Sequence, residues 1–381
     1  MTDDARSGLG ATLRAAARAV RAGHLEAAVA LYRRAADAAP ADWSTHYNLG
    51  TLLLGLGRPA EAAVALRAAI ARDAERPEPH ATLAMALLGV GDEEAGWREY
   101  LWRREAPRLP AARPRAALPD RLDGERVAVL NEQGLGDALF FLRYAAALAA
   151  RGATVVHDPF PKLAPILDRV PWLARPTAPP DRRLPLGDLP FLVAAHRSDP
   201  HPPALALSAP PRRRAAVARR LAEIAAGPWL GATWRAGVRA GGALFKEVPP
   251  ARLGAALRSW PGPVAVLQRA PRPDDVAAFQ AGLGRPVVDL SALNERLEDM
   301  LAVLDCLAEH VGVSSTNVHL RAGLGRPSRV LVPWPAEFRW RAGAERSPWF
   351  PDSPTYRQGA GGDWAAALER LAEDVSAASG A

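Results

Sequence analysis

The chain has 381 residues, of which 49% are hydrophobic, so it is long enough for two or three domains and too apolar for wholesale disorder. Its single cysteine, Cys306, excludes an intrachain disulfide, and no apolar run is long enough to cross a bilayer, so we expect a cytoplasmic protein with no membrane partner. The net charge of +7 would suit nucleic acid, but the basic residues are almost all arginine and are dispersed, which favours a solvated surface and no nucleic-acid partner.

Residues 1–104 carry an internal repeat with helical character. Gly23, Gly57 and Gly91 are spaced 34 residues apart, at the expected turns between helices, and pairs of alanines keep the same period. Small residues let paired helices approach closely while larger ones fill the groove between them, which is the pattern of tetratricopeptide repeats. We predict an all-α tetratricopeptide-repeat domain over this range.

The third copy of the repeat degrades into the sequence GWREYLWRREA. Three repeats are near the minimum for a stable stack, so we expect this copy to pack on the module that follows the repeats, through Trp97, Tyr100 and Trp102. The repeats would then offer a groove suited to a segment of another protein.

Residues 105–123 are rich in Pro, Arg and Ala without a period, which predicts a linker. After it, short β-rich runs alternate with alanine-rich helical stretches, as in parallel sheets covered by helices on both faces. The expected strands are residues 127–130, 153–156, 229–234, 263–268, 286–290, 311–315 and 329–333. We predict two Rossmann-like domains, 124–226 and 227–381, that face each other across a cleft, the second closed by a C-terminal helix.

The sequence NEQGLGD follows the first expected strand directly. Gly134 and Gly136 allow a tight turn and a close approach of the backbone to a ligand. A turn alone requires neither Glu132 nor Gln133, so we predict an active-site loop. Asp137, at the end of the motif, either caps the following helix or acts as a general base.

Polar residues also follow the strands expected in the second domain, at the sheet edge where open α/β folds bind ligands. They are Arg235, Gly237, Gln268, Ser314, Ser315, Thr316, Asn317 and His319. Lys246 ends a glycine loop, where it would meet a diphosphate or simply face solvent. The hydroxyls of residues 314–316 suit an anion at a helix start, although ordinary capping explains them as well. Paired cysteine spacings and an HExxH motif are missing, so a metal site is not supported.

Two long stretches carry a family resemblance: EQGLGDALFFLRYAAALAARGATVV and GVSSTNVHLRAGLGRPSRVLVPWPAEFRW. Between them TWRAG, LFKEVP, LQR and DLSALNERLEDM follow in the same order. The chain resembles bacterial tetratricopeptide-repeat proteins with a C-terminal glycosyltransferase module of the heptosyltransferase-like, family 9 type. That resemblance implies the GT-B fold, with an acceptor side in the first Rossmann-like domain and a nucleotide-sugar side in the second.

The resemblance also implies a reaction, namely inverting transfer of a sugar from a nucleotide sugar without a metal or another cofactor. Asp137 matches the proposed general base of the family, Lys246 matches a lysine that meets the donor phosphates, and His319 matches a histidine near the donor. The acceptor would be a protein presented by the repeats, with flagellin a candidate. Ser314 stands where the family usually has an aspartate, which leaves a non-catalytic scaffold with a decayed transferase module as the alternative.

Overall fold

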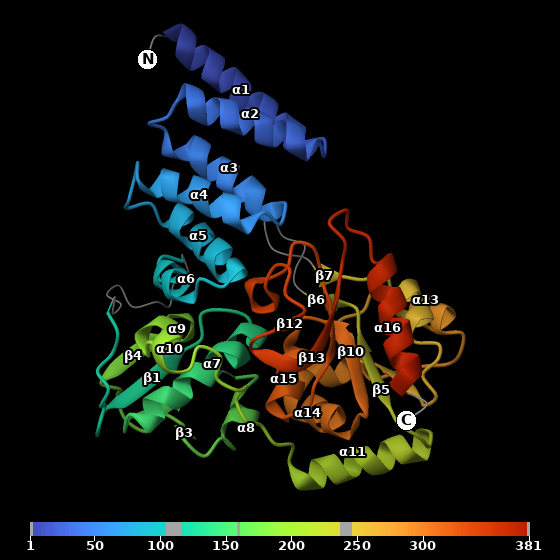
Figure 1. Cartoon of the computed structure of the whole chain (residues 1–381). Helices are drawn as coiled ribbons and strands as arrows, with labels where there is room; N and C mark the ends of the chain where they lie inside the picture. Colours follow the sequence, from blue (N-terminus) through green and yellow to red (C-terminus); the bar gives the residue numbers. More distant parts are fainter. Residues whose placement is uncertain (1–2, 104–115, 158–160, 237–245, 379–381) are drawn as a thin grey trace. The chain divides into compact units, whose positions relative to one another are not determined.

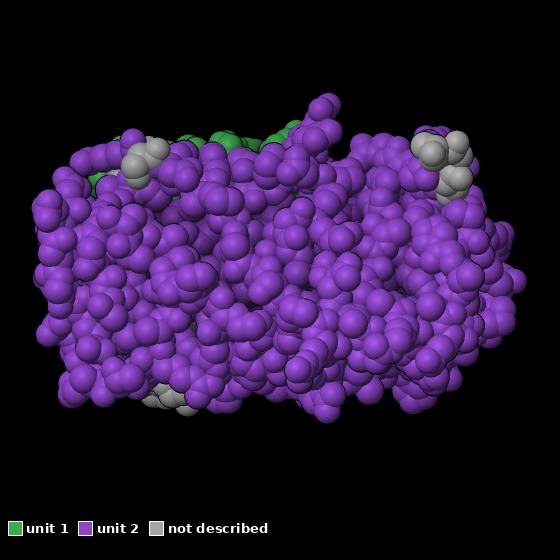
Figure 2. Space-filling view, turned by 90° about the horizontal axis from the view of Figure 1, so that it is seen from below, with its two compact units in different colours: residues 1–107, 335–344 green, residues 108–334, 345–381 purple. Residues whose placement is uncertain are grey.

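The structure is a computed structural model that describes residues 3–103, 116–157, 161–236 and 246–378 (Figure 1). The chain divides into two compact units (Figure 2). Unit 1 contains residues 1–107 and 335–344, and unit 2 contains residues 108–334 and 345–381. We call residues 335–344 the inserted segment, because it joins unit 1 although the residues on either side of it belong to unit 2.

Unit 1 is built from consecutive helices joined by short turns (Figure 1). They are α1 (Asp3–Arg21), α2 (Leu25–Ala38), α3 (Trp43–Gly55), α4 (Pro59–Ile70), α5 (Pro77–Val90) and α6 (Glu93–Tyr100). The glycines that keep the 34-residue period, Gly23, Gly57 and Gly91, have φ angles of 77°, 70° and 91°. Residues other than glycine adopt such angles only with strain, so the period reflects a conformational requirement of each inter-helix turn.

Close helix packing accounts for the small residues of the repeat. A Cβ added to Gly50 in α3 would lie 2.5 Å from Cγ of Leu66 in α4, which is closer than carbon atoms can approach. Ala62 and Ala69 on α4 are fully buried, and Ala62 packs in the same core as Leu66. The predicted all-α repeat domain is therefore confirmed in its helices, its turns and its small residues.

The inserted segment packs on the last helices of unit 1. The ring of Phe338 lies 5.6 Å from that of Trp97 and 6.5 Å from that of Tyr100, centroid to centroid. These two contacts place the third repeat against residues 335–344, which belong to unit 1, so packing of the repeat on the module of unit 2 stays a prediction. Trp102 differs from the prediction, because its ring stacks on His80 within the repeats at 4.2 Å.

Unit 2 begins with a four-stranded parallel sheet in the order β3-β2-β1-β4. The strands are β1 (Arg126–Leu130), β2 (Thr154–His157), β3 (Leu173–Ala174) and β4 (Arg182–Pro185). The connecting elements are α7 (Leu135–Ala150), α8 (Ala164–Leu167), η1 (Leu186–Asp188), α9 (Leu189–Leu192) and α10 (Ala195–Ser198). The first of these helices begins at Leu135, within the NEQGLGD motif and two residues before the expected start at Asp137. Of the proposed linker, residues 105–115 lie outside the described part of the chain.

The second sheet has the order β12-β13-β11-β10-β5-β8-β9. Its strands are β5 (Leu230–Thr233), β8 (Val264–Val266), β9 (Val288–Asp289), β10 (Glu309–Val313), β11 (Arg329–Val332), β12 (Arg346–Ser347) and β13 (Phe350–Arg357). A separate antiparallel ribbon is formed by β6 (Arg235–Ala236) and β7 (Lys246–Glu247). The helical elements that follow unit 2's first sheet are α11 (Pro211–Ile224), α12 (Pro250–Ala256), α13 (Asp275–Leu283), η2 (Ser291–Glu295), α14 (Leu297–Cys306), α15 (Thr316–Gly323) and α16 (Ala365–Ala378), while η3 (Phe338–Trp340) lies in the inserted segment.

Apart from its antiparallel edge strand β12, the second sheet has the strand order of a Rossmann fold. From β9 to β13 the neighbours are the third, second, first, fourth, fifth and sixth strands in chain order, and they pair in parallel. The predicted fold class, helical repeats followed by two Rossmann-like α/β halves, is confirmed. The proposed boundary at residues 226 and 227 falls between α11 and β5.

Each sheet has a topological switch point, the place where the strand order reverses and where open α/β folds bind ligands. In the first sheet this point lies between β1 and β4, and in the second it lies between β5 and β10. Among the described helices, none combines the length and apolar character needed to cross a membrane.

Candidate functional site

The switch point of the second sheet is hollow. A cavity of about 290 Å³ lies there, lined by residues that follow β5, β8 and β10 together with one residue of η2. The lining residues are Thr233, Arg235, Ala236, Gln268, Arg269, Ala270, Asn294, Ser315, Thr316 and Asn317. Two of them are arginines and none is acidic, so the lining favours an anionic ligand.

Three polar atoms on the lining residues are buried without a hydrogen-bond partner among the described residues. They are Oγ1 of Thr233, Oγ of Ser315 and Oδ1 of Asn317. A buried polar group left unpaired costs about 1–3 kcal/mol, and such groups are uncommon in native proteins. Their gathering around one cavity is what a site completed by a polar ligand requires.

The start of α15 contributes to the same wall. Ser315 occupies the N-cap position, but its side chain makes no capping hydrogen bond, so the capping interpretation is wrong for this hydroxyl. The first amides of a helix lack intrahelical partners and favour an anion. Thr316, the first residue of the helix, therefore offers both an amide and a hydroxyl on the cavity lining.

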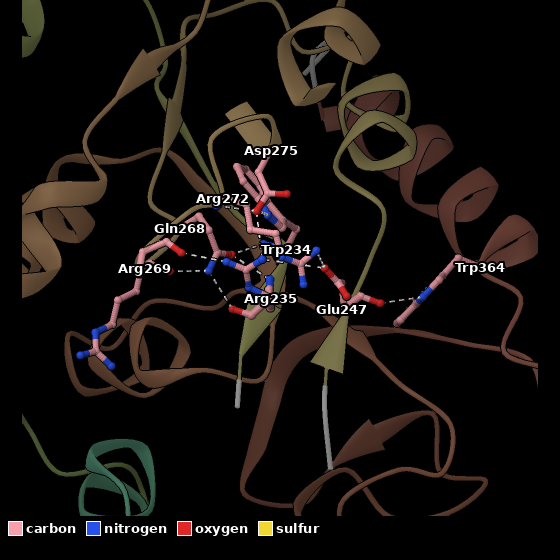
Figure 3. Close-up of polar contacts among 9 residues, drawn as sticks. Trp234, Arg235, Glu247, Gln268, Arg269, Arg272, Asp275 and Trp364 are labelled. Carbon is pink, nitrogen blue, oxygen red and sulfur yellow. Dashed lines mark hydrogen bonds and ion pairs between the residues drawn. The ribbon is translucent and has the colours of Figure 1, made fainter. Parts of the chain in front are cut away.

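Gln268 holds the cavity wall together. Its Oε1 accepts hydrogen bonds from the amides of Trp234 (3.1 Å) and Arg235 (2.8 Å), and its Nε2 donates to the carbonyls of Arg235 (3.1 Å) and Arg269 (2.9 Å) (Figure 3). Because the whole amide is engaged with backbone, Gln268 ties the end of β5 to the end of β8. We assign it to shaping the site for a ligand.

The guanidinium of Arg235 is held in position by neighbouring acceptors. Its Nη1 lies 3.0 Å from Oδ2 of Asp275 and 3.9 Å from Oε1 of Glu247, and its Nη2 donates to the carbonyl of Ala270 at 2.8 Å (Figure 3). The side chain is only 12% exposed. Arg269 differs, because its side chain is 65% exposed at the cavity and lies 3.6 Å from Glu295.

Lys246 begins β7 and pairs through its backbone with Ala236, which lines the cavity. The next residue, Glu247, is anchored on both sides: its carboxylate pairs with Arg272 at 2.9 Å, and its carbonyl accepts from Nε1 of Trp364 at 3.1 Å (Figure 3). The strand that carries Lys246 is thus held beside the cavity. Gly237 and the glycine loop that precedes Lys246 lie outside the described residues.

Asp137 lies at the third position of α7, after Gly134 at the N-cap. A Cβ on Gly134 would lie 3.2 Å from Oδ2 of Asp137. A Cβ on Gly136 would lie 3.2 Å from Cδ2 of His319 and 3.7 Å from the amide nitrogen of Thr316. The starts of α7 and α15 therefore meet closely, which brings the Asp137 loop to the helix that lines the cavity.

His319 lies on α15 among aromatic rings. Its ring is 6.1 Å from that of Phe140 on α7 and 5.4 Å from that of Phe350 on β13, centroid to centroid. It is buried and is not one of the cavity-lining residues. The structure therefore gives His319 a place in the packing between the two halves of unit 2.

Glu132 bridges the two strand ends that border the switch point of the first sheet. Its Oε2 accepts from the amide of Leu186 at 3.2 Å and its Oε1 from the amide of Gly187 at 2.8 Å, both directly after β4. Gln133 in turn donates from Nε2 to Glu132 at 3.3 Å. These two residues of the predicted active-site loop hold the loop against the neighbouring strand end.

Two further residues refine the predicted site. Ser314 follows β10 and is 1% exposed, but it does not line the cavity. Asn294 lines the cavity and was not predicted, because its stretch SALNE carries no pattern that marks a ligand site.

Over the part of the chain that is described, His, Cys, Asp and Glu form no group of three that could hold a metal ion.

Residues 19–94 match the family described as tetratricopeptide repeat. Residues 19–94 are thus a tetratricopeptide-repeat region, and the chain continues into an α/β module of two mainly parallel sheets. It is 27% identical over 376 residues to Protein FlbA of Caulobacter vibrioides, in an alignment that covers 88% of this chain and 61% of FlbA. The chain therefore spans less than two thirds of the length of that relative.

Three solved glycosyltransferase structures are similar to this chain. The glycosyl transferase family 9 protein of Veillonella parvula is 11% identical over 62% of this chain and 87% of its own, with a TM-score of 0.48. The ADP-heptose lps heptosyltransferase II of E. coli is 12% identical over 66% and 98%, with a TM-score of 0.45. An O-GlcNAc transferase mutant of Thermobaculum terrenum is 15% identical over 100% and 95%, with a TM-score of 0.27. Because these scores are below 0.5, the fold assignment rests on the strand order of the two sheets.

Proposed function

We propose that the chain is a glycosyltransferase that moves a sugar from a nucleotide-sugar donor to an acceptor hydroxyl. The observation that carries the proposal is the hollow switch point of the second sheet, with its unpaired polar atoms, its two arginines and the start of α15. The motifs that resemble family 9 glycosyltransferases fall on this cavity and on the Asp137 loop that meets α15.

The donor's phosphates fit the anion-favouring part of the cavity. The hydroxyls of Thr233 and Ser315 would donate to phosphate oxygens, as would the first amides of α15. Arg235 adds a fixed positive charge, and Arg269 adds one that can move because its side chain is exposed. Lys246, on the neighbouring ribbon, would meet the same phosphates as a point charge.

Asp137 would act as general base. Its carboxylate takes the proton of the acceptor hydroxyl while the hydroxyl oxygen forms a bond to the anomeric carbon. The bond from that carbon to the phosphate oxygen breaks, and its electron pair leaves with the nucleotide, where the groups around α15 stabilise the developing charge. A single displacement of this kind inverts the anomeric centre. We propose that it needs neither a metal nor another cofactor.

The test of this function is a screen of nucleotide sugars for transfer or hydrolysis by the full chain. Asp137→Asn should reduce turnover about 10²–10⁴-fold while nucleotide-sugar binding persists, because the variant removes the base and leaves the cavity intact. Asp120→Asn, an exposed carboxylate of the same unit, is the matched control and should leave turnover unchanged. If no nucleotide sugar binds or turns over, the proposal is wrong.

We further propose that the repeats present a protein acceptor, with flagellin a candidate from the family resemblance. Deleting residues 1–76 removes α1 to α4 and keeps α5, α6 and their contacts with the inserted segment. The shortened chain should lose transfer to the protein acceptor and keep nucleotide-sugar binding. If it modifies the acceptor as fast as the full chain, the repeats do not deliver the acceptor.

The alternative is a non-catalytic scaffold that binds nucleotide through the cavity. The observation that favours it is Ser314, buried where the family usually has an aspartate. A chain that binds a nucleotide sugar with the same affinity before and after Asp137→Asn, and that transfers no sugar to any acceptor, would support this second function.

A further inference from the structure

Two buried asparagines on the cavity lining form a short chain of amides. Nδ2 of Asn294 donates to the carbonyl of Leu267 at 3.1 Å and to that of Ser291 at 2.8 Å. Nδ2 of Asn317 donates to the same Leu267 carbonyl at 3.2 Å and to Oδ1 of Asn294 at 3.4 Å. Since each amide nitrogen faces only acceptors, the orientation of both side chains is fixed.

The amide chain ends in an acceptor. Oδ1 of Asn317 is buried and has no hydrogen-bond partner among the described residues, and Asn317 itself is 3% exposed. A carbonyl-type oxygen can only accept hydrogen bonds, so its partner must bring an O–H or N–H group. Ionised phosphate brings acceptors alone and cannot satisfy it. The portion of a ligand that suits Asn317 is therefore one that carries an O–H or N–H group.

The position of the amide chain in the sheet indicates which portion that is. Both asparagines converge on Leu267, directly after β8, the second strand of the Rossmann order. In this topology the phosphates lie at a helix start near the switch point, and the ribose lies at the end of the second strand. The groups suited to phosphate, by contrast, are Thr233 at the end of β5 and Ser315 after β10.

We propose that Asn317, oriented by Asn294, selects the nucleoside portion of the ligand by accepting a hydrogen bond from a ribose hydroxyl or a base N–H. This inference rests on the proposed function and deepens it, because it separates recognition of the nucleoside from recognition of the phosphates. Asn317 is thus a specificity-determining residue of the same cavity.

The test measures binding by calorimetry to the full chain. The probes are ADP, GDP, UDP, CDP and CMP, with pyrophosphate and phosphate as references that lack a nucleoside. For the wild-type chain the best nucleotide should bind more tightly than its reference. Asn317→Leu should reduce that preference about tenfold while the affinity for the reference changes less than about twofold, because only the contact with the nucleoside is lost.

Two further variants test whether the loss of nucleotide preference comes from the acceptor oxygen of Asn317. Ser291→Ala removes another buried hydroxyl that lacks a partner among the described residues but does not line the cavity, so it should keep the preference. Asn317→Ala removes the same acceptor without placing a bulky or charged group beside the carbonyl of Leu267 and Oδ1 of Asn294, so it should reduce the preference as Asn317→Leu does. It also provides the decisive comparison if Asn317→Leu does not fold, as judged by thermal unfolding.

The outcomes separate this inference from the proposed function. If Asn317→Leu or Asn317→Ala keeps the full preference, the inference is wrong while the nucleotide site stands. If the wild-type chain binds nucleotides no more tightly than their references, the inference also fails. If no nucleotide and no nucleotide sugar binds at all, the proposed function fails with it.

Discussion

The two halves of unit 2 share a topology and use it differently. In the first sheet the carboxylate of Glu132, beside the switch point, accepts hydrogen bonds from two backbone amides. In the second sheet the switch point holds a cavity of about 290 Å³, and three polar atoms on its lining residues have no partner in the described part of the chain. The strand order provides each sheet with a place where a ligand can bind. The unsatisfied polar groups indicate that a ligand binds at the second of these places.

The same comparison distinguishes stability from function. Glu132 satisfies backbone groups, so it should contribute to folding in the absence of any ligand. The hydroxyls and the amide around the cavity cost free energy until a ligand pairs with them. Substitutions at the two switch points should therefore have opposite effects on stability.

The largest effect should come from Glu132→Ala. The substitution leaves the buried amides of Leu186 and Gly187 without their acceptor, which should lower the free energy of unfolding by about 3 kcal/mol. Glu132→Gln keeps one acceptor oxygen and should lose about half as much. Urea unfolding of both variants checks this ordering. A change in the free energy of unfolding below about 0.5 kcal/mol for Glu132→Ala would show that the hydrogen bonds of Glu132 do not stabilise the fold.

Acid should destabilise the second sheet through His310, which lies on β10 beside the hollow switch point. Burial, followed by the positive charge of Arg321, lowers the pKa of His310 on this strand from 6.5 to about 3. The unfolded chain takes up a proton near pH 6.5 and the native chain does not until about pH 3, so stability falls as the pH drops through this window. Between pH 7 and pH 5 the loss should be about 2 kcal/mol.

His310→Asn removes the titrating group and keeps a polar atom near the hydroxyl of Ser328, with which Nδ1 of His310 interacts at 2.9 Å. The free energy of unfolding of this variant should depend less steeply on pH between 7 and 5. Equal slopes for the variant and the wild-type chain would mean that other groups set the acid response.

Thr233→Val should have the smallest effect on stability, and the sign of that change is what tests whether the hydroxyl awaits a ligand. Thr233→Val replaces a buried, unpaired hydroxyl with a methyl group and should stabilise the ligand-free chain by up to about 1 kcal/mol while weakening pyrophosphate binding. Thr45→Val is the matched control, since its buried hydroxyl donates to the carbonyl of Asp42 at 2.9 Å and its loss should destabilise by about 1 kcal/mol. Destabilisation by both variants would contradict the view that Thr233 awaits a ligand.

Much of this arrangement could be predicted from the sequence because the controlling effects are local. The glycines at the inter-helix turns adopt positive φ, and the buried strands β1, β5 and β10 contain short apolar runs that stop at or just before polar residues. The NEQGLGD motif and the residues around Ser315 lie at strand ends, and so the sequence predicted their places at the two switch points.

The elements that were not predicted depend on distant contacts. The strand β13 reads FPDSPTYR, and its two prolines conceal a strand that pairs with β11 on one side and only the short β12 on the other. The inserted segment owes its place to Trp97 and Tyr100, more than two hundred residues away in the chain. Asn294 reaches the cavity through the carbonyl of Leu267, which no local pattern specifies.

Hydrogen exchange with and without ligand tests the central claim, that the second switch point binds the donor and the first does not. The amides of Thr316 and Asn317 start α15 and lack intrahelical partners, so they should exchange fast in the free chain. With saturating pyrophosphate or the best nucleotide of the panel, their exchange should slow at least about tenfold, whereas the amides of Leu186 and Gly187, already bonded to Glu132, should not change. Protection at Leu186 and Gly187 with none at Thr316 and Asn317 would contradict the account.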